Sequence, residues 1–278
     1  MARKKKAIDH MVNRMSKMRL VDEQAAHKPA VKVERRSEDA QKVATQPFRF
    51  FDLPYELRLR VYEEVLVFPR TIDLDPSNYS TVAPALSLFL VDRRMHAEAS
   101  RVFYGRNTFR VFPVHGRYIN RKHPLLAWFP RKYRELLTRL ELRLGPGFTK
   151  PPKCWVVDSR LGLAAAKKVY RLSVFVEIDP ASNDVFEGFR VANNFYTEYC
   201  INLLRGLLAQ VPSIHDVEFD AYPSVPSTSP LLAGLLDEAR LHQKRIAWGP
   251  ERGWDKIVDG DLAGVLQKTG LPQRRDCA

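Results

Sequence analysis

The side chains that could perform catalysis are scattered along this sequence of 278 residues. Asp158 with Ser159, and His215 with Asp216, supply residue types found in hydrolytic triads. Neither pair belongs to a strained turn that would present a nucleophile or to a sequence that would build an oxyanion hole. The glycine-rich, His-Glu and Gly-x-Ser-x-Gly motifs of nucleotide-binding proteins, metallopeptidases and hydrolases do not occur. We therefore expect a protein that is not an enzyme.

Metal and cofactor binding is equally unsupported. The three cysteines, Cys154, Cys200 and Cys277, are far apart, and no pair has the spacing of metal ligands. His115 and His123 are isolated from other candidate ligands. An odd number of cysteines without an export signal indicates reduced thiols in the cytosol or nucleus. We expect no metal and no cofactor.

Charge is concentrated at the N-terminus. Residues 1–47 contain twelve Lys or Arg against six Asp or Glu, so they supply +6 of the formal +13, and they hold no aromatic residue. Such a composition cannot bury enough apolar surface to offset the entropy lost on ordering, so we expect a disordered basic tail. The run from Arg3 to Lys6 is typical of nuclear import signals. No segment is apolar enough for secretion or for a membrane span, and we expect a cytoplasmic or nuclear protein.

Two amphipathic helices are predicted within residues 48–112. The first begins after Leu53 and Pro54 and ends near Phe68, before Pro69. The second runs to Gly105, and a short strand follows at residues 108–112. Apolar residues recur at helical spacing in both and predict stripes buried against a partner element. These are Leu57, Val61, Tyr62, Val65 and Leu66 in the first helix, and Val91, Met95, Ala99, Val102 and Phe103 in the second.

Strands and helices alternate after residue 112. Alternation of apolar and polar residues predicts strands at 140–144, 172–178, 216–220 and 245–248, and helical patterns occur at 133–137, 163–168, 199–208, 231–242 and 262–266. Helices between strands favour parallel pairing. We predict an α+β fold in which an irregular α/β region, leucine-rich-repeat-like or an open sheet, follows the helical module. The predicted domains are 1–47, 48–112, 113–270 and 271–278.

At these residues the chain resembles a fungal group of F-box-like proteins. Their pattern is L-P-x-E-L/I-R-x-x-I/V-Y-x-x-L/V, then a helix with C-R-Q-I/L-x-x-E-A/S, then F-Y-x-x-N-x-F. The first block is carried by Leu53, Pro54, Glu56, Leu57, Arg58, Val61, Tyr62 and Val65, the second by Arg93, Met95, Glu98 and Ala99, and the third by Phe103, Tyr104, Asn107 and Phe109. Asp92 and Arg94 replace the usual Cys and Gln, and no Trp lies in the stretch.

This resemblance implies docking on the Skp1 adaptor of a ubiquitin ligase. The residues expected to make that contact are Leu53, Pro54, Leu57, Val61 and Leu66, whereas Arg93, Glu98 and Tyr104 are expected to be structural. The expected function is protein–protein interaction, as a substrate adaptor of a Skp1–cullin–F-box ligase with an unidentified client. One alternative is an F-box-like domain without a ligase role.

A second alternative is a protein that binds nucleic acid or chromatin. Cations can contact phosphates and aromatic rings can stack on bases, so exposed rings would favour this function. Buried rings would instead indicate a loop anchored to the core. The cations are Arg121, Lys122, Arg131, Lys132 and Arg134, interleaved with Tyr118, Trp128, Phe129 and Tyr133.

Overall fold

The computed structural model describes residues 48–73, 76–116, 119, 124–145, 152, 154–182 and 194–254. The expected basic tail, the helix at 262–266 and the C-terminal tail lie outside these residues, as do Arg121, Lys122 and Cys277. None of the helices in the described ranges has both the length and the apolarity needed to cross a bilayer.

The sheet has five parallel strands whose spatial order equals their order in the chain. They are β1 (Thr108–Arg110), β2 (Arg139–Leu144), β3 (Arg171–Val176), β4 (Asp216–Ala221) and β5 (Arg245–Trp248). Apolar residues from neighbouring strands share one face, because Leu140 pairs in register with Leu172 and Leu172 with Val217. All three are fully buried. The structure thus confirms a mixed fold with a parallel sheet, and its strands lie where the alternating pattern predicted them.

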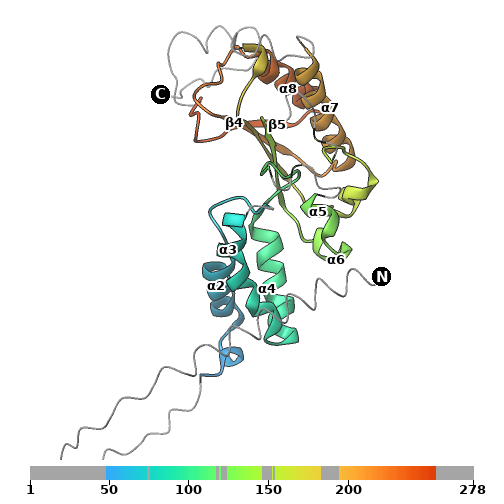
Figure 1. Cartoon of the computed structure of the whole chain (residues 1–278). Coiled ribbons are helices and arrows are strands. Elements are labelled where there is room, and N and C mark those ends of the chain that lie inside the picture. The colour runs from blue at the N-terminus through green and yellow to red at the C-terminus, as the bar shows by residue number, and fades with distance from the viewer. Residues whose placement is uncertain are drawn as a thin grey trace, which may run out of the picture. The chain divides into compact units, whose positions relative to one another are not determined.

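Helices of different lengths connect the strands. Parallel neighbours require crossover connections, and these share one hand, so they collect on one face of a sheet wound in sequence. The two long connecting helices, α7 and α8, lie side by side next to β4 and β5 (Figure 1). The connecting elements are α5 (Leu125–Trp128), α6 (Arg131–Arg134), η3 (Ser159–Leu161), η4 (Leu163–Ala165), η5 (Pro180–Ser182), α7 (Phe195–Gln210) and α8 (Pro230–Leu241).

The N-terminal part of the described chain is helical. It comprises η1 (Phe50–Asp52), α2 (Tyr55–Leu66), α3 (Pro76–Ala85), η2 (Leu86–Leu90) and α4 (Arg93–Arg106), with α2 packed on α4 (Figure 1). Helix α2 ends two residues earlier than predicted. The sequence indicated no helix at α3, because its residues are mostly small and polar and Pro84 lies within it. Val82 nevertheless packs into the core.

Helix α4 begins at a side-chain cap. The Asp92 carboxylate accepts hydrogen bonds from the backbone N–H groups of Arg94 (2.6 Å) and Met95 (3.4 Å). Asp is a preferred N-cap residue because it satisfies donors that have no partner within the helix. Asp92, which stands where the family pattern has Cys, therefore marks the start of α4. Most of the predicted α4 stripe is buried, but Val91 precedes the helix and remains exposed.

Asn107 joins the ends of α2 and α4. Its side-chain amide donates to the carbonyl oxygens of Leu66 (2.7 Å) and Phe103 (2.9 Å), and its side-chain oxygen accepts from the N–H of Phe68 (2.8 Å). The residue is 1% exposed. Three partners leave this buried amide well satisfied, and they fix the turn from α4 into β1.

Asn107→Ala should destabilise the fold by about 2–3 kcal/mol, because it leaves buried backbone groups of both helices without partners. Urea unfolding followed by circular dichroism measures this loss. The matched control is Asn202→Ala on the exposed side of α7, which should change stability by less than about 0.5 kcal/mol. Equal effects of the two substitutions would contradict a role for Asn107 as the link between the helices.

Candidate protein-interaction surface

Helix α2 has a buried face and an exposed apolar face. Arg58, Tyr62 and Leu66 are 4%, 1% and 0% exposed. Leu57, Val61 and Val65 are 46%, 42% and 42% exposed. Residues four apart lie on the same side of a helix, so these three apolar side chains form a continuous outward stripe. We call Leu57, Val61 and Val65 the α2 ridge.

This arrangement corrects the predicted stripe. The sequence treated five apolar residues of α2 as one buried set, whereas the structure divides them between the two faces. Leu66, an expected docking residue, lies in the core because it is aligned with Tyr62 and faces α4. Leu57 and Val61 are exposed as docking requires, Pro54 is exposed at the start of the helix, and Leu53 is half-buried. Val65 was not among the expected docking residues, although its spacing from Val61 would have identified it.

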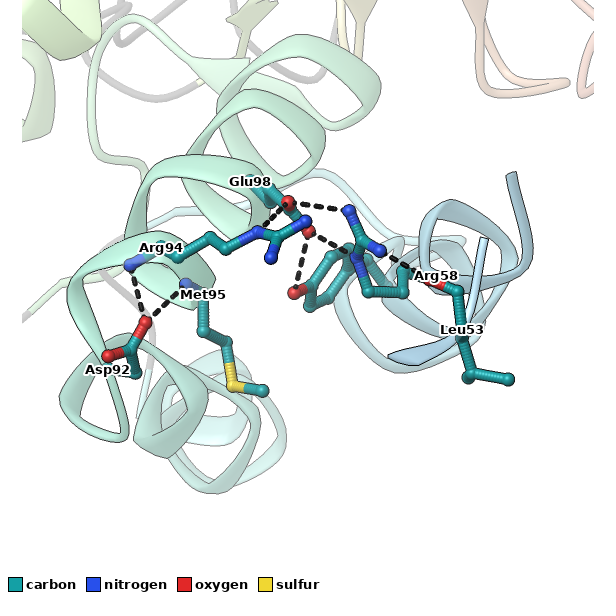
Figure 2. A network of polar contacts seen from close by, with 7 residues as sticks. Leu53, Arg58, Asp92, Arg94, Met95 and Glu98 are labelled. Carbon is teal, nitrogen blue, oxygen red and sulfur yellow. Dashed lines mark hydrogen bonds and ion pairs between the residues drawn. The ribbon is translucent and has the colours of Figure 1, made fainter. Parts of the chain in front are cut away.

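A network of polar contacts fixes the orientation of α2 (Figure 2). The Arg58 guanidinium donates to both oxygens of Glu98 at 2.9 Å, and it also donates to the carbonyl oxygen of Leu53. Glu98 further accepts from the Tyr62 hydroxyl (3.2 Å) and from Arg94 Nε (3.2 Å). Two-pronged guanidinium–carboxylate contacts are both strong and directional. They fasten the first turns of α2 to the middle of α4.

The ionisation of Glu98 follows from these partners. Hydrogen bonding from Arg58 lowers the pKa of Glu98 and outweighs the opposing effect of burial. Burial, with a further contribution from the Glu98 charge, raises the pKa of Tyr62 to about 12. The carboxylate is therefore charged and the phenol neutral at pH 7. The expectation that Glu98 is structural agrees with these contacts, whereas Arg93 is exposed at the start of α4.

The described cations of the region expected to bind nucleic acid contact other residues of the same chain. Arg131 pairs with Glu135 (3.0 Å), and Arg134 donates to the carbonyl oxygen of Leu161 (3.1 Å). Lys132 Nζ lies 4.6 Å from the centre of the Tyr133 ring.

The aromatic rings of this region mostly pack inward. Tyr133 stacks on Tyr104 with ring centres 4.6 Å apart, and Phe129 packs edge-to-face on Tyr104 and Phe109. Trp128 is 60% exposed. Among the described aromatic residues, therefore, two of three anchor the segment to the core, and the geometry favours a structural role.

The residues singled out for chemistry have structural contacts. Asp216 pairs with Arg245 through both oxygens (2.8 and 2.9 Å), and Asp158 caps a short helix through the N–H of Arg160 (2.9 Å). Cys200 is fully buried, and burial raises the pKa of its thiol. Across the described ranges, no group of three or more His, Cys, Asp or Glu is arranged to hold a metal ion.

No family model, curated protein or solved structure matches the chain. Membership of the F-box-like family therefore stays a prediction from the three sequence blocks. What the structure adds is the placement of those blocks. Three of their recurring polar residues, Arg58, Glu98 and Asn107, lie inside the helical part and hold it together, whereas Glu56 and Arg93 are exposed.

Glu98→Gln should make the protein less sensitive to acid. The pKa of Glu98 is lower in the folded chain than its ordinary value of 4.5. The Arg58–Glu98 pair therefore makes its full contribution to stability above pH 4.5. This contribution is lost as pH falls through the lower pKa of the folded chain. We expect the variant to be clearly less stable than wild type at pH 7, and the difference in stability to be smaller at pH 3, in urea titrations at both pH values.

The control for this prediction is Glu135→Gln, which removes an exposed carboxylate paired with Arg131. Exposed pairs contribute little, so its stability should follow wild type at both pH values. Asp216 and Glu238 also have lowered pKa values because of Arg245 and Arg205, so some acid sensitivity persists in every variant. A constant difference between wild type and Glu98→Gln from pH 7 to pH 3 would contradict the assignment.

Proposed function

We propose that this protein is a protein–protein adaptor whose α2 ridge docks on a Skp1-like adaptor of a ubiquitin ligase, in the cytoplasm or nucleus. The observation that supports this proposal is the exposure of Leu57, Val61 and Val65 on a helix whose opposite face is firmly fixed. Aligned apolar side chains on one side of a helix are the anchors used when a helix binds in an apolar groove.

The energetics of the ridge favour a partner. Burying the exposed parts of two such aliphatic side chains contributes about 2 kcal/mol, or about 30-fold in Kd. Because the Arg58–Glu98 contact already holds α2 in place, little further ordering is needed on binding, and more of that gain is realised as affinity. A single exposed Leu would not indicate a binding site. Leu57, Val61 and Val65 do, because they form a row on a helix that is held in place.

The alternatives receive less support. The internal contacts of Arg131 and Arg134, and the inward packing of Phe129 and Tyr133, do not favour a nucleic-acid surface. An F-box-like domain without a ligase role would have the same helices and differs in the partner of the ridge, so direct binding to Skp1 separates the two functions.

Leu57→Asp combined with Val61→Asp should weaken binding to purified Skp1 by at least about 30-fold, because each change places a charge where an apolar contact is lost. Calorimetry on purified proteins measures the Kd. The matched control is Leu241→Asp at the end of α8, where Leu241 is 75% exposed and outside the ridge. This control should bind Skp1 with the wild-type affinity.

Circular dichroism should show the same helix content and melting behaviour in all three proteins, because the substituted side chains already contact solvent. If the wild-type chain does not bind Skp1, or if the ridge variant binds as tightly as the control, the ligase-adaptor function is excluded. The F-box-like fold without a ligase role would then be the better description.

A further inference from the structure

The face of the sheet opposite the buried apolar rows forms a hollow. Side chains alternate along a strand, so the residues next to the buried ones point to the other face. Register places Glu141, Ser173 and Glu218 in one row of this face, and Arg143, Phe175 and Asp220 in the next. The hollow above them has a volume of about 930 Å³, and the segment from Phe68 to Thr71 and residues Pro250 and Glu251 contribute to its lining.

The hollow is acidic although the chain is basic. Among the residues that the structure describes, its charged lining residues are Arg70, Arg110 and Arg143 against Asp73, Glu141, Glu218, Asp220 and Glu251, so carboxylates exceed arginines by two. The whole chain has a formal charge of +13. A local excess of negative charge on a protein of opposite net charge favours a cationic ligand at this place.

Two of the three arginines that line the hollow, Arg110 and Arg143, already have partners within the chain. Arg110 pairs with Asp73 (2.6 Å) and with Glu141 (3.1 Å). Arg143 pairs with Glu177 and donates to the Tyr222 hydroxyl (2.6 Å). Arg110 and Arg143 are therefore engaged with Asp73, Glu141 and Glu177, and their charges are not available to the remaining carboxylates.

Glu218 and Asp220 carry negative charge that Arg110 and Arg143 do not compensate. Glu218 lies 3.5 Å from Arg171, whose side chain is 40% exposed, so screening by water weakens that pair. Asp220 accepts hydrogen bonds from the backbone N–H groups of Glu251 (3.0 Å) and Arg252 (2.8 Å). In the described ranges no cationic side chain forms an ion pair with Asp220. The two residues are two apart on β4 and thus face the same side, about 7 Å apart along the strand.

An aromatic ring forms part of the floor beside these carboxylates. Phe175 is half-buried on β3, directly in register with Asp220. The guanidinium of Arg143 lies 4.5 Å from the centre of its ring, so this ring already accepts a cation on the chain itself. Aromatic faces attract Lys and Arg side chains and pack against their aliphatic stems.

We propose that this hollow binds an extended, basic peptide segment of the client, with the charge of a Lys or Arg side chain between Glu218 and Asp220, beside Phe175. The inference deepens the proposed function, on which it rests for the identity of the ligand as a client. The hollow and the α2 ridge are formed by different residues, so each can be tested without the other.

The test uses the full chain and a fluorescent ten-residue peptide of alternating Arg and Ser, which places its cations on one side when extended. A peptide with Glu in place of Arg is the ligand control. Fluorescence anisotropy should show binding of the Arg peptide that weakens as salt is raised, and no binding of the Glu peptide. Glu218→Gln combined with Asp220→Asn should weaken binding about tenfold.

The control variant is Asp237→Asn on α8, whose carboxylate is 74% exposed and lies outside the hollow. It should bind the Arg peptide as wild type does, and so should the Leu57→Asp and Val61→Asp variant. Absence of binding at low salt, equal affinity for the Glu peptide, or equal loss in the hollow and control variants would each overturn the proposal. None of these outcomes would bear on the binding of Skp1 by the α2 ridge.

Discussion

The contact between Arg58 and Glu98 decides which side of α2 faces solvent. Two stripes on this helix compete for burial: Leu57, Val61 and Val65 are all apolar, whereas the other stripe begins with a charged arginine. Burying an unpaired charge is costly, so Arg58 by itself would disfavour burial of the second stripe. The second is buried because Glu98 on α4 receives Arg58 through two hydrogen bonds and also accepts from Tyr62. A rotation of α2 by one residue, about 100°, would break all of these contacts.

Helix α2 buries an ion pair on one face and leaves aliphatic side chains exposed on the other. Buried pairs often contribute less to stability than apolar residues of similar size, and their better supported role is to specify one packing among several. In this protein the specified packing presents an apolar ridge to solvent. An exposed apolar ridge of this kind is explained if the ridge contacts another protein.

How much the sequence predicted depended on whether the deciding contact was local. The strands β2 to β5 were located because alternation is visible within four to six residues, and α7 and α8 because their stripes consist mostly of leucines. The prediction of which face of α2 is buried was wrong in part. The residue that selects this face, Glu98, lies 40 positions away from Arg58. The hollow was not predicted at all, because its carboxylates come from separate segments that only the register of the sheet brings together.

The most direct measurement of the central claim is photo-crosslinking from the ridge itself. A photoreactive phenylalanine analogue at position 61, in place of Val61, would be irradiated in the presence of purified Skp1, with the same analogue at Leu241 as reference. Both positions are exposed to solvent, so the fold should tolerate either. If the α2 ridge docks on Skp1, a covalent product with Skp1 forms from position 61 and none forms from position 241. No product from position 61, or equal yields from both positions, would contradict this docking.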